Sequence, residues 1–168
     1  MEATTNSRRA KVTLPTDEQI LIEREFDAPK HLVFKAFTTP ELVSRWWHAK
    51  RGEVRLVEID LRAGGRWRYV MVADDGTEVG FHGEYREIVP DQRIVSTEVY
   101  EGLPEGVSEE DAATVNTTTF TEADGRTLLT ILIQAKSKVS RDAIIDSGME
   151  AGLHDALELL EQVALSLR

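Results

Sequence analysis

The stretch of sequence that decides the fold is SRDAIIDSGMEAGLHDALELLEQVALSL, residues 140–167. At about 100° per residue, its apolar side chains gather on one arc of a helix and its polar side chains on the other side. The apolar arc holds Ile145, Met149, Leu153, Ala156, Leu160, Val163 and Leu167, and the polar side holds Glu150, His154, Asp155, Glu158, Glu161 and Gln162. We therefore expect one amphipathic helix, capped by Ser140, with one flank on a core and the other in water.

This helix would be about 40 Å long, at about 1.5 Å per residue, and so longer than any strand of the chain. Gly148 and Gly152 lie beside its apolar arc, one turn apart. Each costs about 1 kcal/mol relative to alanine in a helix interior. Two interpretations stay open: the glycines allow close packing against a sheet, or they leave room for a bound ligand.

Strand patterns dominate the chain before this helix. Alternation of apolar and polar residues predicts seven strands, at 19–26, 54–60, 65–73, 78–89, 92–100, 114–121 and 127–135. Prolines at favourable first positions predict two short helices, one at 29–37 and a second that carries Trp46 and Trp47. Most links between strands are short, the acidic loop 101–113 being the longest, so the strands should pair antiparallel as a meander.

Together these elements predict an α+β fold. A curved, seven-stranded antiparallel sheet would wrap around the long C-terminal helix, with the two short helices after the first strand. Residues 1–18 are polar and contain a basic cluster, Arg8, Arg9 and Lys11; we interpret them as a flexible tail and give the cluster no role. Residues 19–168 should form a single domain, because nothing in the pattern marks a linker.

Composition limits the classes of function. The 168 residues carry a net charge of -10, which argues against nucleic acid as a partner because phosphate binding needs a basic surface. The chain has no cysteine and its four histidines lack metal-ligand spacing, so we expect no metal and no cofactor. No apolar run approaches the ~20 residues of a membrane span, and the first residues lack the apolar core of a signal peptide. We therefore expect a cytoplasmic protein.

Six short motifs occur in a characteristic order: REFDAP (24–29), AFTTPEL (36–42), RWW (45–47), GGRW (64–67), GEYREIVP (83–90) and SGMEAG (147–152). With this order and spacing, the chain resembles the SRPBCC superfamily, and more narrowly the branch named after the C-terminal domain of the activator of Hsp90 ATPase. The resemblance covers residues 19–166. It implies a helix-grip (START/Bet v-like) domain with a deep cavity between the sheet and the long helix. The superfamily includes lipid carriers, hormone receptors, aromatic cyclases and co-chaperones, so the resemblance implies no single activity.

The wall of the expected cavity would be built from aromatic and small residues. Alternation places Trp67 and Tyr69 on the same strand face, and Tyr85 on the matching face of the next strand. The hydroxyls of Tyr69 and Tyr85 would orient a ligand, because a buried phenol needs a hydrogen-bond partner. The candidate lining residues are Phe34, Phe37, Trp46, Trp47, Trp67, Tyr69, Met71, Phe81, Gly83, Tyr85, Gly148, Met149, Gly152 and Leu153.

Two residues are candidates for catalysis, although no catalytic motif is present. His48 follows the tryptophan pair at the expected cavity mouth, and Glu98 lies in the strand 92–100. By contrast, His82, Glu84 and Arg86 share the strand face opposite Tyr85. We interpret those three as a solvated row of charges rather than a catalytic group.

Three functions follow as hypotheses. The first is binding of a small hydrophobic or aromatic ligand in the internal cavity. The second is an enzyme of the cyclase or hydrolase type that uses the same cavity. The third is an Hsp90-type co-chaperone or another module for a protein partner, which an exposed apolar patch on the convex face of the sheet would favour.

Overall fold

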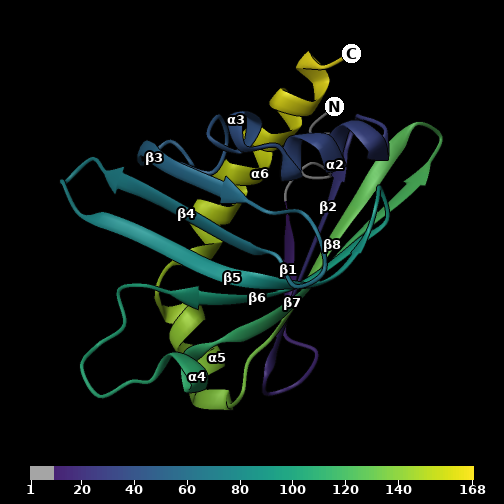
Figure 1. Cartoon of the computed structure of the whole chain (residues 1–168). Helices are drawn as coiled ribbons and strands as arrows, with labels where there is room; N and C mark the ends of the chain where they lie inside the picture. Colours follow the sequence, from purple (N-terminus) through teal and green to yellow (C-terminus); the bar gives the residue numbers. More distant parts are fainter. Residues whose placement is uncertain (1–9) are drawn as a thin grey trace.

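The computed structural model describes residues 10–168, in which one antiparallel sheet curls around a C-terminal helix (Figure 1). The strands are β1 (Lys11–Thr13), β2 (Gln19–Phe26), β3 (Gly52–Ile59), β4 (Arg66–Ala73), β5 (Glu78–Val89), β6 (Arg93–Tyr100), β7 (Thr114–Ala123) and β8 (Arg126–Gln134). The helices are α2 (Lys30–Thr38), α3 (Pro40–Val43), α4 (Glu109–Ala112), α5 (Lys138–Asp146) and α6 (Met149–Ser166). Within residues 10–168, no helix has the length and apolar character needed to span a bilayer.

The sheet has the strand order β1-β2-β8-β7-β6-β5-β4-β3. Strands β3 to β8 form the predicted meander, and β2 extends the sheet by pairing with β8. The helix-grip fold is thus confirmed, with eight strands in the described residues where the sequence predicted seven. The additional strand, β1, lies in the segment interpreted as a tail, and its Lys11 pairs with Glu23 of β2. Arg8 and Arg9 of the basic cluster lie outside the described residues.

The prediction of a single helix at 140–167 is wrong in one respect. The structure has two helices there, α5 and α6. Gly148 stands at the break with φ of 82°, in the left-handed region that glycine enters without a steric penalty. The N-cap of α5 is Ser137, whose hydroxyl accepts a hydrogen bond from the backbone N–H of Ser140, and not Ser140 itself. The chain therefore turns at Gly148, and α6 alone lies within the grip (Figure 1).

The core is fully buried where the C-terminal half of α6 packs against β2 and β8. Phe26, Leu129, Leu157 and Leu160 are each at most 2% exposed there. Three candidate lining residues, Phe34, Phe37 and Trp46, belong to a neighbouring aromatic cluster. Phe34 and Phe37 pack edge-on against Phe120, Phe37 stacks on Trp46, and the Trp46 indole N–H donates to the carbonyl of Ala36 at 2.9 Å. These three aromatic residues hold α2 and α3 on the core.

A buried ion pair joins α6 to β2. Glu161, predicted on the polar side of the helix, is only 5% exposed, and Arg24 of β2 is 4% exposed. Their charged atoms lie 3.3 Å apart, and the second carboxylate oxygen of Glu161 accepts from the backbone N–H of Asp27 at 2.7 Å. The Arg24 guanidinium also lies 4.7 Å from the ring centre of Phe26. Glu161 therefore fixes the position of α6 against β2 and is not a solvent-exposed residue of the helix.

We expect Arg24→Ala to lower the free energy of unfolding by about 3–5 kcal/mol, because it leaves the Glu161 charge buried without its guanidinium. Urea denaturation measures this loss. The control is Arg126→Ala, which removes ion pairs with Asp27 and Glu25 at the surface and should cost only ~0–1 kcal/mol. Equal effects of the two substitutions would contradict the role given to Arg24.

Alanine at the two helix glycines should act in opposite directions. Gly148→Ala forces a side chain into the left-handed region and should cost about 1–2 kcal/mol. Gly152 lies inside α6, and a Cβ added there would meet no heavy atom within 4 Å. Gly152→Ala should therefore gain up to about 1 kcal/mol of stability. The same denaturation experiment checks both variants, and effects of equal sign would show that the helix break is misassigned.

Candidate functional site

Aromatic rings line the inner face of β4 and β5. Trp67 and Tyr69 of β4 are buried with ring centres 4.9 Å apart, and Trp47, from the turn after α3, packs edge-on against Tyr69 and Phe81 at 5.4 and 5.9 Å. Met149 and Leu153 of α6 are partly buried and pack against the hydrophobic core to which Trp67 and Tyr69 belong. The strand alternation read from the sequence accounts for these positions, because side chains two residues apart share a face.

A polar group lies beside these rings, on the inner face of β6 and β7. Glu98 shares its strand face with Ile94, a core residue, and register places it opposite Thr114. The Asn116 side-chain N–H donates to Glu98 Oε1 at 3.1 Å, and the Thr114 hydroxyl donates to Asn116 Oδ1 at 2.9 Å. Burial raises the pKa of Glu98, and the bond from Asn116 only partly offsets this.

The two tyrosines complete this polar group. The Tyr69 and Tyr85 side chains lie close enough for each phenol to influence the pKa of the other. Burial raises the pKa of both phenols, and the nearby Glu98 carboxylate raises that of Tyr69 further. Tyr69 therefore connects the aromatic cluster to Glu98.

Packing is looser at this end of the grip than around the C-terminal half of α6. Leu153 belongs to the same helix arc as Leu160, yet Leu153 stays partly exposed while Leu160 is fully buried. We call this region the loosely packed end; its partly exposed, inward-facing residues are Met71, Phe81, Glu98, Asn116, Met149 and Leu153. These inward-facing side chains thus keep accessible surface, whereas Leu160 keeps none.

The structure gives other functions to several candidate residues. Gly83 leaves no free space, because the Trp67 indole lies over it and donates to the carbonyl of Thr97 at 3.1 Å. Gly148 is exposed at the helix break and lines nothing. Both ring nitrogens of His48 engage backbone groups, the carbonyl of Arg45 and the N–H of Lys50, at 3.1 and 3.0 Å. His48 thus stabilises the turn between α3 and β3.

Sequence analysis missed Asn116 and Thr114, although a signal was present. In the strand TVNTTTF, residues 114–120, every second residue shares the face of the aromatic Phe120. Thr114, Asn116 and Thr118 therefore had to point inward with it, and a row of polar residues on a core face indicates a buried hydrogen-bond network. Among the residues described, no group of three His, Asp or Glu side chains could hold a metal ion.

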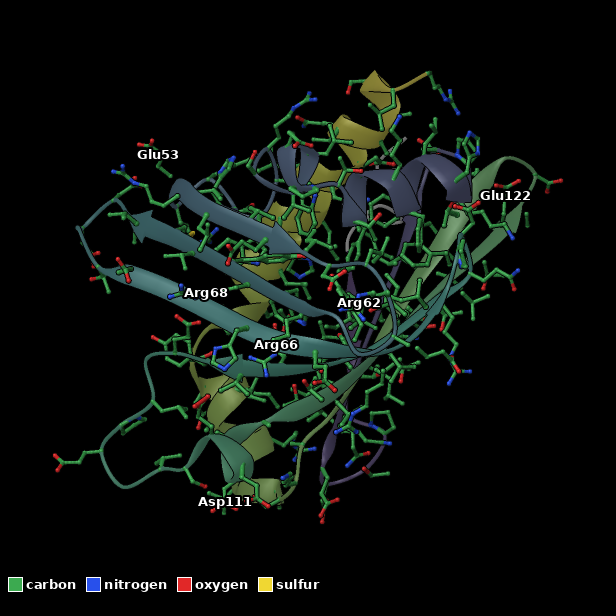
Figure 2. All side chains as sticks on the ribbon, in the orientation of Figure 1. Glu53, Arg62, Arg66, Arg68, Asp111 and Glu122 are labelled. Atoms are coloured by element: carbon green, nitrogen blue, oxygen red, sulfur yellow. The ribbon has the colours of Figure 1, made fainter. Side chains whose placement is uncertain are left out.

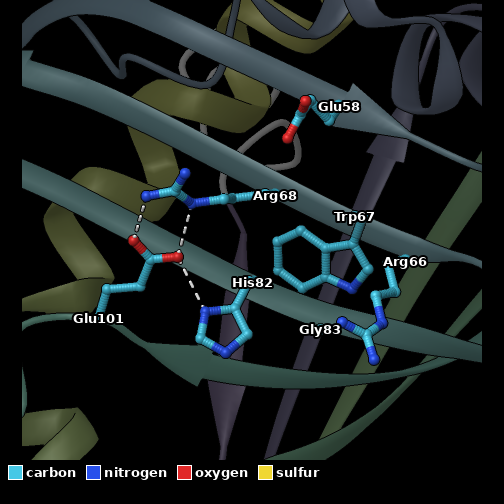
Figure 3. Close-up of a pocket in the computed structure, with 7 residues that line it drawn as sticks. All are labelled: Glu58, Arg66, Trp67, Arg68, His82, Gly83 and Glu101. Carbon is cyan, nitrogen blue, oxygen red and sulfur yellow. Dashed lines mark hydrogen bonds and ion pairs between the residues drawn. The ribbon is translucent and has the colours of Figure 1, made fainter.

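The outer face of the sheet is charged. Arg66 and Arg68 of β4 project from it (Figure 2), and a hollow of ≈ 290 Å³ lies among Glu58, Arg66, Arg68, His82 and Glu101. Figure 3 shows Arg68 and His82 converging on the Glu101 carboxylate. Arg68 donates to both carboxylate oxygens at 2.9 Å, and His82 Nδ1 lies 2.8 Å from one of them.

This network fastens the acidic loop 101–113 to β5. The other ring nitrogen of His82 lies 2.9 Å from Glu109 of α4, so one histidine joins both ends of the loop. The hydrogen bonds from Arg68, and to a lesser degree His82, hold the pKa of Glu101 below its usual range. His82 is thus partly exposed, and its partners are Glu101 and Glu109 of the loop and not the Glu84 and Arg86 of the predicted row.

Glu98 should make stability fall as pH rises. Because its pKa is raised in the folded state, the folded protein binds the proton more tightly than the unfolded chain, where the pKa is about 4.3. Stability is therefore lost as pH rises from about 4.3 through the folded pKa. Glu98→Gln does not titrate, so its stability relative to the wild type should increase between about pH 4 and pH 7. Urea denaturation across pH measures this, and Glu84→Gln on the outer face should show no such trend.

Comparison with known proteins agrees with this architecture. A Rhodobacter sphaeroides protein of known structure is 21% identical, with a TM-score of 0.83 over 94% of this chain and 99% of that one. A Mycobacterium smegmatis protein is 23% identical (TM-score 0.80; 91% and 94% covered), and a Nitrosomonas europaea protein 20% identical (TM-score 0.79; 91% and 97% covered). These structures share the fold, and no curated protein matches the sequence. The family model described as "Activator of Hsp90 ATPase homolog 1-like protein" matches residues 27–164, so the chain belongs to this family.

Proposed function

We propose that the protein binds a small hydrophobic or aromatic molecule between the sheet and the N-terminal half of α6. The observation that carries this proposal is the partial exposure of inward-facing side chains at the loosely packed end, above all of Leu153. A side chain at the centre of a buried helix face would be closed off by a solid core, as Leu160 is. The apolar surface that stays uncovered there would gain free energy from a ligand that covers it.

The lining suits a ligand with a flat apolar body. Trp47 packs edge-on against Tyr69 and Phe81, and such pairs leave ring faces for a further aromatic group. Trp47 is attached through a turn and not through a strand, so it can move with less cost than the rings of the sheet. Glu98 and the tyrosine pair supply the few polar contacts that orient a ligand in an apolar site.

A cyclase or hydrolase activity is the second candidate. Glu98 favours it, because a carboxyl group inside the fold with a raised pKa is a candidate general acid or base. His48 gives no support, since both of its ring nitrogens bond to the backbone. The co-chaperone hypothesis has less in its favour, because the outer face of β4 and β5 presents Arg66, Arg68 and His82 and not an apolar patch.

Calorimetric titration with 1-naphthalenemethanol, a neutral aromatic probe, tests the proposal. We expect binding by the wild type and at least about tenfold weaker binding by Leu153→Trp, whose indole fills the space beside the rings. The matched control is Ala151→Trp, because Ala151 is exposed on the same helix. It should bind like the wild type. Absence of binding by the wild type, or equal affinity of both variants, would contradict an interior site.

A further inference from the structure

The chemistry of the interior site depends on the carboxyl group of Glu98, which has no basic side chain as an ion-pair partner within residues 10–168. Among the described residues, the one hydrogen bond to Glu98 comes from Asn116, and no lysine, arginine or histidine pairs with it. Glu161, the carboxylate buried beside β2, has Arg24 as its counter-charge. A buried carboxyl group normally has such a partner, because removing its charge from water is costly.

The geometry leaves one oxygen of Glu98 available. The Thr114 hydroxyl fixes the amide of Asn116 by donating to its oxygen, which turns the amide N–H toward Glu98 Oε1. Within residues 10–168, Oε2 has no hydrogen-bond partner. In the described residues, His154 Nδ1 is the one side-chain polar atom that is both fully buried and unpartnered, so Oε2 keeps accessible surface. A ligand donor can therefore reach Glu98 Oε2 without displacing a protein contact.

The surroundings of Glu98 Oε2 favour a ligand whose hydrogen-bond donor carries a positive charge. Tyr69 lies close enough to feel the charge of Glu98, and its ring belongs to the cluster of Trp47, Trp67 and Phe81. Aromatic faces attract organic cations through their negative potential, and more strongly away from water. An anionic ligand would meet Glu98 without a compensating cation, so charge selects against it.

We propose that the interior site takes a small hydrophobic or aromatic amine, whose ammonium group donates to Glu98 Oε2 while its apolar body lies among Trp47, Tyr69 and Phe81. This inference rests on the proposed function and adds the charge of the ligand. The ammonium group would supply the counter-charge that Arg24 supplies to Glu161. Asn116 is a positioning residue, since it holds the other oxygen of Glu98.

Three probes of one shape test the charge: 1-naphthalenemethylamine, 1-naphthalenemethanol and 1-naphthaleneacetate. Calorimetry at neutral pH should give the amine at least about tenfold higher affinity than the alcohol, and the acetate the lowest affinity. Glu98→Gln should remove the preference for the amine, so that the amine and the alcohol bind with similar affinities. Glu84→Gln, which removes the same charge from the outer face of β5, should leave all three affinities unchanged.

The possible outcomes separate this inference from the proposed function. If the alcohol binds as tightly as the amine, the inference is overturned while the interior site stands. If none of the three probes binds, the proposed function itself fails. Equal loss of the amine preference in Glu98→Gln and Glu84→Gln would show that only net charge matters, and would overturn the role of Glu98. Should Glu98→Gln not fold, the ratio of the three affinities in the wild type still decides.

Discussion

The buried ion pair between Arg24 of β2 and Glu161 of α6 is the contact on which the grip depends. Burial of apolar surface drives the sheet to curl around the helix, but this force has no direction and does not fix how far the helix slides or turns. Two opposite charges removed from water tolerate little displacement, and the bond from the Asp27 N–H to Glu161 adds a second fixed point. The pair thereby sets which residues α6 presents to the sheet, from Leu160 in the closed core to Leu153 at the loosely packed end.

Two glutamates three positions apart show how the sheet divides the molecule electrostatically. Glu101 lies on the charged outer face, where Arg68 and His82 stabilise its carboxylate and lower its pKa. Glu98 lies inside, where burial raises its pKa and where Asn116 is its one donor among residues 10–168. The first glutamate is satisfied and ties loop 101–113 to β5; the second is a carboxyl group that a ligand could complete. The fold thus places this carboxyl group among inward-facing side chains that stay partly exposed.

Much of the fold and part of the candidate site could be predicted. The alternation in β4 put Trp67 and Tyr69 on the inner face, because the period of two is a property of every strand. The partners of Glu98 could not be predicted with the same ease, since Asn116 is 18 positions away and meets it only through the register of β6 with β7. The hydrogen bonds of His48 to the turn could not be predicted either, since they depend on backbone geometry that its neighbours in sequence do not reveal.

The sequence by itself determined the fold class, the positions of seven strands and the apolar arc of the last helix, because these follow from local periodicity and from residues such as proline that act on their own backbone. Tertiary structure decided the rest. A glycine at position 148 is compatible with a continuous helix and with a break. The tertiary structure places it in the left-handed conformation, which ends α5 and begins α6. Glu161 had the pattern of a solvated residue, and Arg24, 137 positions away, made it a buried one. A charge buried against a distant partner leaves no local periodicity, so only the assembled fold reveals it.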